Sequence, residues 1–184
     1  MSHPDIRPAT PGDLPDILRL VHELAVYERE PDAVEATEAD FAAVLFPTEA
    51  GPTAFCHVVE ADEGGVLRCD EGASKEGTRR VVGMALWFLT FSTWTGQQGI
   101  HLEDLFVEPE HRGSGLGKAL LVHLAQIATE RGHRRLEWTV LRWNEPAIAF
   151  YESLAAAPQV EWETYRLDGD ALAQVGTPTP SVVR

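Results

Sequence analysis

Apolar residues recur at every third or fourth position in residues 11–30 and 115–131, and this spacing predicts two amphipathic helices. The second is the clearer one, because its leucines form one stripe and Gly132 follows where a left-handed C-terminal cap is expected. Shorter helices are predicted at 37–46, where a Thr and an Asp three residues later resemble a capping box, and at 144–155.

Short apolar runs between these helices predict strands. They cover residues 54–61, 81–91, 100–107, 134–141 and 160–167, after a short strand candidate near the N-terminus. Residues 62–80 are polar and contain glycine, which suits a long hairpin loop. Strands and helices in this order predict one mixed α/β sheet with helices on its faces.

The length of 184 residues suits one domain, and no linker divides the chain. We expect a single domain over residues 1–170. Residues 171–184 are expected to form a C-terminal tail that is partly disordered.

Composition narrows the possible functions. The formal charge of −14 argues against general nucleic-acid binding and is compatible with a small cationic substrate, although an acidic surface alone also accounts for it. The histidines have no metal-ligand spacing, so no metal is expected. Cys56 and Cys69 are expected to be reduced thiols. Without a signal or membrane-spanning pattern, we expect a cytoplasmic protein that binds neither membrane nor nucleic acid.

A glycine turn, "HRGSGLGK", follows the strand at 100–107 and opens the helix at 115–131. The first amides of a helix lack partners and attract an anion, and glycines let a phosphate approach the backbone. Arg112 and Lys118 add positive charge. Neither the P-loop nor the dinucleotide fingerprint fits the spacing. A phosphate-binding turn is favoured over an ordinary glycine-rich turn.

The strand before this turn changes phase. Apolar residues occupy alternate positions up to Leu102 and again from Leu105, with Glu103 and Asp104 between them. A slip of one residue is what a β-bulge produces, and a bulge leaves backbone groups unpaired.

The helix at 144–155 begins with Asn144 at an N-cap position and Pro146 in the first turn. Tyr151 lies two turns after Asn144, so both point to one side of the helix. A phenol in that place can act as a general acid. The alternative is a tyrosine that only packs in a core or interface.

Together these motifs resemble a known family. "RGSGLG" is similar to the pyrophosphate-binding turn of the GNAT N-acetyltransferase superfamily. The ordered series "IRPAT", "DILRL", "ELAVYE", "LEDLFV", "RGSGLG" and "WNEPAIAFY" resembles the spermidine/spermine (diamine) and thialysine N-acetyltransferases. The resemblance implies an α/β GNAT fold with a splayed, bulged strand in a mixed central sheet and helices on both faces. It also implies acetyl-CoA as co-substrate and a homodimer with the amine site between subunits.

The resemblance assigns roles to individual residues. It implies Glu103 as the base for the amine and Tyr151 as the acid for the thiolate. The implied cofactor-binding residues are Leu105, Phe106, Val107, Arg112, Gly113, Ser114, Gly115, Leu116, Gly117, Lys118 and Asn144. The implied amine-binding residues are Tyr27, Glu28, Trp94, Glu103, Asp104 and Trp162. For Glu28, Trp94 and Trp162, a solvated charge or core packing is an equally good interpretation.

Two positions depart from the family pattern. Ser92, in "TFSTW", replaces a carboxylate that would meet a distal ammonium, which favours shorter amines or amino acids over long polyamines. Ala155 replaces a glycine after the helix at 144–155, so its C-terminal cap is expected to differ.

The sequence thus predicts an acetyl-CoA-dependent N-acetyltransferase that acts on a small cationic amine by direct attack in a ternary complex. Two alternatives stay open. One is acetylation of a protein or peptide amine, and the other is a non-catalytic acyl-CoA-binding sensor.

Overall fold

The computed structural model describes residues 6–62 and 79–177. The chain divides into two compact units, Met1–Thr139 and Val140–Arg184. The first unit holds the sheet and the second begins just before the "WNEP" motif. Each unit is described by itself below.

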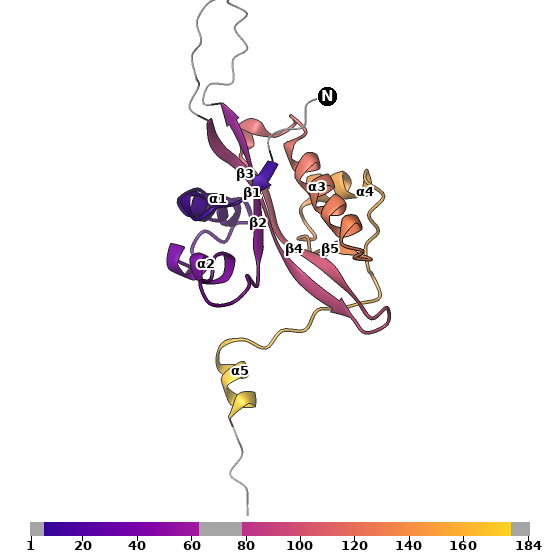
Figure 1. Ribbon diagram of the computed structural model, residues 1–184. Helices are drawn as coiled ribbons and strands as arrows, with labels where there is room; N and C mark the ends of the chain where they lie inside the picture. The colour runs from indigo at the N-terminus through magenta and orange to yellow at the C-terminus, as the bar shows by residue number, and fades with distance from the viewer. Residues whose placement is uncertain (1–5, 63–78, 178–184) are drawn as a thin grey trace, which may run out of the picture. The chain divides into compact units, whose positions relative to one another are not determined.

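The first unit is built on a five-stranded mixed sheet with the order β1-β2-β3-β4-β5 (Figure 1). The strands are β1 (Ile6–Pro8), β2 (Phe55–Asp62), β3 (Arg79–Ser92), β4 (Gln97–Val107) and β5 (Leu136–Trp138). Neighbouring strands are antiparallel except β4 and β5, which are parallel. The predicted mixed α/β sheet is confirmed, although β5 is shorter than the predicted strand at 134–141.

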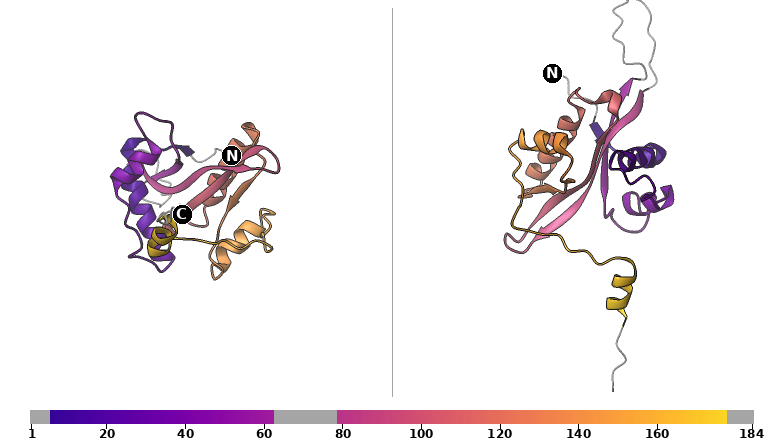
Figure 2. Two further views of the ribbon diagram at one scale, coloured as in Figure 1. Left: turned by 90° about the horizontal axis from the view of Figure 1, so that it is seen from below. Right: turned by 180° about the vertical axis from the view of Figure 1, so that it is seen from behind.

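Helices cover both faces of this sheet. α1 (Leu14–Tyr27) and α2 (Glu38–Leu45) lie on one face and α3 (Leu116–Glu130) on the other (Figures 1 and 2). The helix α1 follows a 3₁₀ turn, η1 (Pro11–Asp13), and a second such turn, η2 (Pro109–His111), follows β4. The predicted capping box is present at α2, where the Thr37 hydroxyl accepts from the Asp40 amide. Gly132, after α3, has a φ of +71°, as expected for a left-handed cap.

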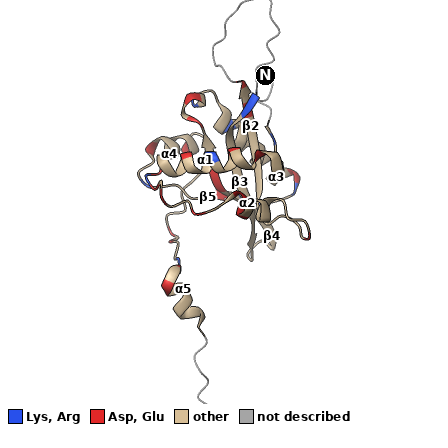
Figure 3. Ribbon diagram, turned by 90° about the vertical axis from the view of Figure 1, so that its left-hand side faces the viewer, with Lys and Arg blue, Asp and Glu red and all other residues tan. Residues whose placement is uncertain are grey.

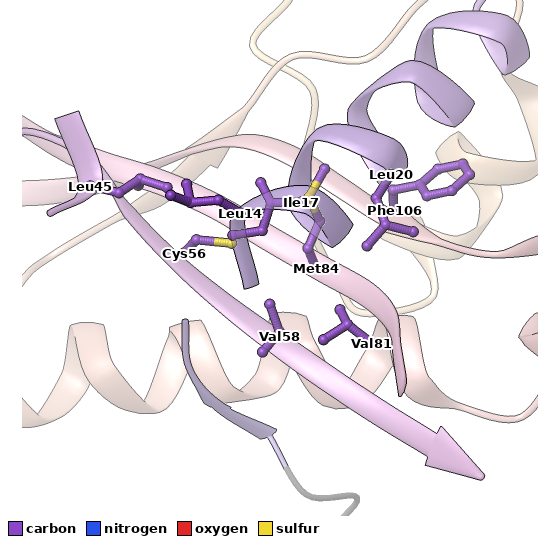
Figure 4. Close-up of a cluster of buried hydrophobic side chains, with 9 residues drawn as sticks. All are labelled: Leu14, Ile17, Leu20, Leu45, Cys56, Val58, Val81, Met84 and Phe106. Carbon is purple, nitrogen blue, oxygen red and sulfur yellow. The ribbon is translucent and has the colours of Figure 1, made fainter. Parts of the chain in front are cut away.

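The core between the sheet and α1 and α2 is apolar, and its nine residues are drawn in Figure 4. They are Leu14, Ile17, Leu20, Leu45, Cys56, Val58, Val81, Met84 and Phe106. Phe106 comes from β4, so this core holds one face of the strand that carries the candidate site. Burial, followed by the negative charges of Asp13 and Asp104, raises the pKa of the Cys56 thiol to about 12. Cys56 is therefore a packing residue, and Cys69 lies outside the described residues.

The second unit contains α4 (Glu145–Glu152) and α5 (Gly169–Gly176). The strand predicted at 160–167 is wrong, because these residues form no strand here. Trp162 and Tyr165 are exposed, and no strand among the described residues pairs with this segment. The helix α5 was not predicted, and residues 178–184 of the predicted tail lie outside the described residues.

Acidic residues outnumber basic ones along the described ribbon, in line with the 29 Asp and Glu against 15 Lys and Arg of the sequence (Figure 3). Most of the predicted loop at 62–80 lies outside the described residues. Among the helices that the structure describes, none is long and apolar enough to cross a membrane.

Candidate active site

The strand β4 carries a bulge at the two adjacent acids. Leu86 of β3 pairs with Asp104, whereas the next residue, Trp87, pairs with Leu102. Glu103 is the extra residue between these two pairs, so the predicted phase slip is confirmed. Because the register resumes at Asp104, its side chain shares a face of β4 with Phe106, the face that α1 and α2 cover.

β4 separates from β5 at the same place. The two strands pair only from Ile100 to Leu102, opposite Leu136 to Trp138. Among the described residues, β4 has no partner strand on this edge from residue 103 to residue 107. The backbone groups of a strand edge are strong hydrogen-bonding groups, so this opening can pair with an extended ligand. The splayed, bulged strand predicted by resemblance is confirmed.

The glycine turn presents bare backbone at the start of α3. Gly113 and Gly115 have φ values of +76° and +91°, which favour glycine. A methyl group placed on either residue would meet no atom within 4 Å, so the space in front of the turn is open. The first turn of α3 contains no acidic residue. The open turn and the unpaired helix amides fit an anion such as a pyrophosphate.

An ion cluster around the buried Glu108 holds the end of β4 against the rest of the unit. Glu108 follows β4 directly and is 2% exposed. Its carboxylate accepts from both terminal nitrogens of Arg80 and, at 2.5 Å, from Arg19 of α1. Arg19 also donates to the Val81 carbonyl at 2.8 Å. These contacts join α1, β3 and the end of β4. Removing one partner would leave the charge of Glu108 buried and uncompensated, which would destabilise the fold.

Arg112 turns back from the glycine turn toward α1. Its Nε donates to the Val107 carbonyl at 2.9 Å. Its guanidinium lies over the rings of Tyr27 and Phe106, 4.7 and 5.2 Å from their centroids. Among the residues described, it makes no ion pair with a carboxylate. Arg112 therefore keeps its charge available for an anionic ligand while two aromatic faces orient it.

A pocket of about 640 Å³ opens between α1 and the end of β4. Its lining is largely apolar and consists of Arg19, His22, Glu23, Val26, Tyr27, Phe106, Pro109 and Arg112. Three of these had been assigned roles by resemblance, Tyr27 for the amine and Phe106 and Arg112 for the cofactor. The pocket could thus receive a ligand that reaches both groups of residues.

Three carboxylates, Glu28, Glu103 and Asp104, are coupled through their charges where the edge of β4 opens. Burial, followed by the negative charges of Glu103 and Glu28, raises the pKa of Asp104 to about 6. Burial also raises the pKa of Glu28, which caps α1 directly after Tyr27. A cation placed beside Asp104 would offset both its burial and the neighbouring negative charges. The acidic cluster of Glu28, Glu103 and Asp104 is thus suited to an ammonium group.

In the second unit, Asn144 caps α4 as predicted, since its side chain accepts from the Ala147 amide at 3.3 Å. Tyr151 lies in the last turn of the same helix, next to the ring of Phe150. Ala155, after α4, takes a φ of +62°, the left-handed conformation that is typical of a glycine cap. The C-terminal cap therefore keeps that backbone conformation, and the expected difference is not found.

Within the first unit, Trp94 and Ser92 lie at the other end of β4 from the acidic cluster. Trp94 lies in the turn between β3 and β4 and is 87% exposed. That turn precedes Glu103 by six strand residues, about 20 Å along β4. Ser92 pairs with Gln97 at the same end of the sheet. Trp162, in the second unit, is 70% exposed.

The sequence did not single out His101 or Glu108. His101 lies on β4 with its Nε2 3.8 Å from Oε2 of Glu103. The alternation of side chains along a strand could have placed His101 on the same face as Glu103, which lies two positions later. No local signal could have paired Glu108 with Arg19, which lies 89 residues away.

A family model described as the acetyltransferase (GNAT) family matches residues 21–156. This chain belongs to the GNAT acetyltransferase family. The match spans the acidic cluster, the glycine turn and the "WNEP" helix. The protein is accordingly an acetyltransferase enzyme.

Similar proteins agree with this assignment. Over 173 residues the chain is 35% identical to thialysine N-epsilon-acetyltransferase of Bos taurus, covering 92% of this chain and 95% of that protein. It is 31% identical to L-ornithine N5-acetyltransferase NATA1 of Arabidopsis thaliana, covering 92% of this chain and 86% of that one. A solved integron cassette protein from the mobile metagenome of V. cholerae superimposes with a TM-score of 0.72 at 25% identity, covering 97% and 100% of the two chains. The predicted GNAT fold and family are confirmed.

Proposed function

We propose that this acetyltransferase transfers the acetyl group of acetyl-CoA to a primary amine of a small cationic acceptor. The acceptor class is a diamine, a polyamine or a lysine-like amino acid. The observation that carries the proposal is the acidic cluster of Glu28, Glu103 and Asp104 beside the opened edge of β4. Because the raised pKa of Asp104 reflects burial and nearby negative charge, a bound cation would stabilise its ionised form.

The glycine turn would hold the pyrophosphate of acetyl-CoA. Its open space at Gly113 and Gly115 supports this assignment, as does the charge of Arg112. The edge of β4 from Leu105 to Val107 would pair with the pantetheine arm, because no strand of the described chain covers that edge. Leu116, Gly117 and Lys118 would contribute the first turn of α3, Ser114 the turn itself and Asn144 the start of α4.

Each step of the transfer would use a group of this chain. Glu103 would accept a proton from the ammonium through water, while Asp104 and Glu28 hold the amine in place. A backbone amide near Phe106 would stabilise the negative charge that develops on the thioester oxygen. Tyr151 would give its proton to the departing thiolate and regain one from the amine. Tyr27, Trp94 and Trp162 would line the channel for the acceptor.

Ser92 favours a short acceptor. A carboxylate at this position would bind the distal ammonium of a long polyamine, whereas the serine hydroxyl carries no charge to do so. The similarity to proteins named for thialysine and L-ornithine supports an amino-acid acceptor, and the similarity to a human spermidine/spermine N(1)-acetyltransferase-like protein supports a polyamine. We favour a short diamine or an amino acid with a side-chain amine.

The working form is proposed to be a cytoplasmic homodimer with the amine site between subunits, free of metal. Both units would belong to one catalytic domain over residues 1–170, with residues 171–184 as a tail. The family match supports this extent, because it crosses the boundary between Thr139 and Val140.

A screen of CoA release over diamines, polyamines, lysine analogues and aminoglycosides tests the proposal, with Ser92→Asp as a companion variant. We expect turnover with short diamines or lysine-like amino acids, and improved use of long polyamines by Ser92→Asp. Turnover on peptide amines alone would favour the protein acetyltransferase. Acetyl-CoA binding without turnover on any amine would favour the sensor.

A further inference from the structure

His101 extends the acidic cluster along β4. Its imidazole Nε2 lies 3.8 Å from Oε2 of Glu103, two residues further along the strand. The ring stacks on Phe88 of β3, with centroids 4.9 Å apart and planes inclined by 27°. The side chain of His101 is 22% exposed, whereas that of Glu103 is 55% exposed. The stacked ring is thus oriented toward Glu103 and still reaches solvent.

Three other carboxylates lie on the elements around His101, and one of them has partners of its own. Its register partner on β5 is Glu137, which forms an ion pair with Arg135 at 3.1 Å and accepts from the Thr90 hydroxyl at 3.2 Å. Asp104 follows Glu103 on β4, and the charge of Glu28 acts on Asp104. Among the described carboxylates, Glu103 is the one whose oxygen is recorded within 4 Å of the His101 ring, so it is the one with which His101 can exchange a proton.

The overall reaction releases one proton, which has to leave the active site. An ammonium and a thioester become an amide, a thiol and one proton. The C–S bond of the thioester breaks and the C–N bond of the amide forms. One nitrogen-bound proton goes to the thiolate by way of Tyr151, and the other must leave through Glu103. A bound acceptor would cover the exposed side of Glu103, so the carboxylic acid needs another route to solvent before the next turnover.

We propose that His101 takes this proton from Glu103 and passes it to solvent. The inference rests on the proposed function, because it requires Glu103 as the base. His101 acts through Glu103 and is therefore a positioning residue. In the first step, a water molecule that bridges the 3.8 Å between the two side chains relays the proton, and the imidazole becomes imidazolium as Glu103 returns to carboxylate. In the second, imidazolium gives its proton to water or buffer. Imidazole suits this task because it gains and loses protons near neutral pH.

The variants His101→Phe and His101→Gln test the proposal in the full-length enzyme. Phenylalanine keeps a ring that can stack on Phe88 but cannot carry a proton. Turnover is measured with the best acceptor between pH 6 and pH 9, at low and high concentrations of imidazole buffer. We expect kcat of both variants to fall about tenfold at low buffer, less than the roughly 10²–10⁴-fold of a direct acid or base, since water can still accept the proton. Added imidazole should restore most of the loss.

Acetyl-CoA affinity, measured by calorimetry, should be unchanged in both variants. Equal kcat and an equal pH profile for His101→Phe and wild type would overturn the role of His101 alone. A loss of kcat that imidazole does not restore would overturn it too, since it would mark a structural effect. A wild-type enzyme that acetylates no amine would instead overturn the proposed function, and this inference with it.

Discussion

The indole Nε1 of Trp87 donates a hydrogen bond of 3.1 Å to Nδ1 of His57 in the interior of the first unit. Both side chains are buried, and the ring of His123 on α3 lies edge-on to His57 with centroids 4.7 Å apart. The bond fixes the neutral tautomer in which the proton is on Nε2. Burial, followed by the nearby charges of His123 and Arg131, lowers the pKa of His57 to about 4.

This pair predicts a loss of stability in mild acid. In the unfolded chain His57 takes up a proton below about pH 6.5, but the folded protein resists protonation down to about pH 4. The free energy of unfolding should therefore fall over that range. His57→Gln keeps an acceptor for Trp87 and cannot be protonated. Urea unfolding at pH 7 and pH 4.5 should show a loss about 2 kcal/mol larger in wild type than in this variant. His22→Gln, at an exposed position, serves as control, and equal losses in wild type and His57→Gln would refute the prediction.

Gly115→Ala should weaken acetyl-CoA binding. The residue has a φ of +91°, where alanine costs about 1–2 kcal/mol, and its methyl group would enter the space assigned to the pyrophosphate. We expect the Kd measured by calorimetry to rise at least about tenfold, which corresponds to 1.4 kcal/mol. Gly51→Ala is the control, because a methyl group there also meets nothing within 4 Å and its φ is ordinary. If Gly115→Ala binds as tightly as Gly51→Ala, the turn is not the pyrophosphate site.

Ala155→Gly should stabilise the second unit. Ala155 adopts a φ of +62° after α4, where its amide donates to the Glu152 carbonyl at 2.9 Å. Glycine removes the strain on the left-handed backbone but adds freedom to the unfolded chain, which leaves a net gain of about 0.5–1 kcal/mol. Hydrogen exchange of the α4 amides should slow in this variant. Ala156→Gly, at a residue with ordinary φ, should accelerate exchange, and the same effect from both variants would contradict the argument.

The features that the sequence predicted are those set by a few neighbouring residues. The capping box at Thr37 needs only Asp40, the cap at Asn144 needs only the next turn, and the bulge at Glu103 is visible as a change of phase within one strand. Each depends on local backbone chemistry, so a short stretch of sequence carries the information.

Features that failed or were missed depend on distant partners. Residues 160–167 form a short run rich in apolar side chains, as strands often do, but such a run supplies no partner strand to hydrogen-bond with. Glu108 is buried because Arg80 and Arg19 converge on it from 28 and 89 residues away. The ring of Phe88 comes to His101 through the register of β3 on β4. Such contacts depend on which strands and helices are neighbours in space, and a local sequence pattern does not specify that.

Tyr151→Phe tests the assigned acid. The substitution removes one hydroxyl at the end of α4, so the helix and the affinity for acetyl-CoA should be preserved. We expect kcat to fall about 10²-fold or more, because the thiolate would leave without a positioned proton donor. Turnover is measured at several pH values and acetyl-CoA affinity by calorimetry. Phe150→Leu, at the neighbouring position, controls for altered packing, and unchanged turnover of Tyr151→Phe at every pH would remove this role.

Asp104→Asn should make the protein more stable and less active. The pKa of Asp104 is about 6 in the folded protein against 3.8 as an isolated group, so the fold disfavours its charged form. As pH rises above 3.8, the unfolded chain loses this proton before the folded chain does, which lowers the free energy of unfolding until about pH 6. Asparagine avoids this penalty, and urea unfolding at pH 8 should show a gain of up to about 3 kcal/mol that vanishes below pH 4.

The same substitution should lower kcat/KM for the amine at least about tenfold, because a carboxylate that holds the ammonium is lost. Wild-type activity should also decline below about pH 6, as Asp104 takes up a proton and the cluster loses negative charge. Glu49→Gln, in an exposed loop, removes one negative charge without either effect and controls for net charge. Gain of stability with full activity would show that Asp104 is buried without serving the acceptor. A loss of both stability and activity would show that the fold needs this carboxylate. Contacts of the charged form would then stabilise the protein by more than its burial costs.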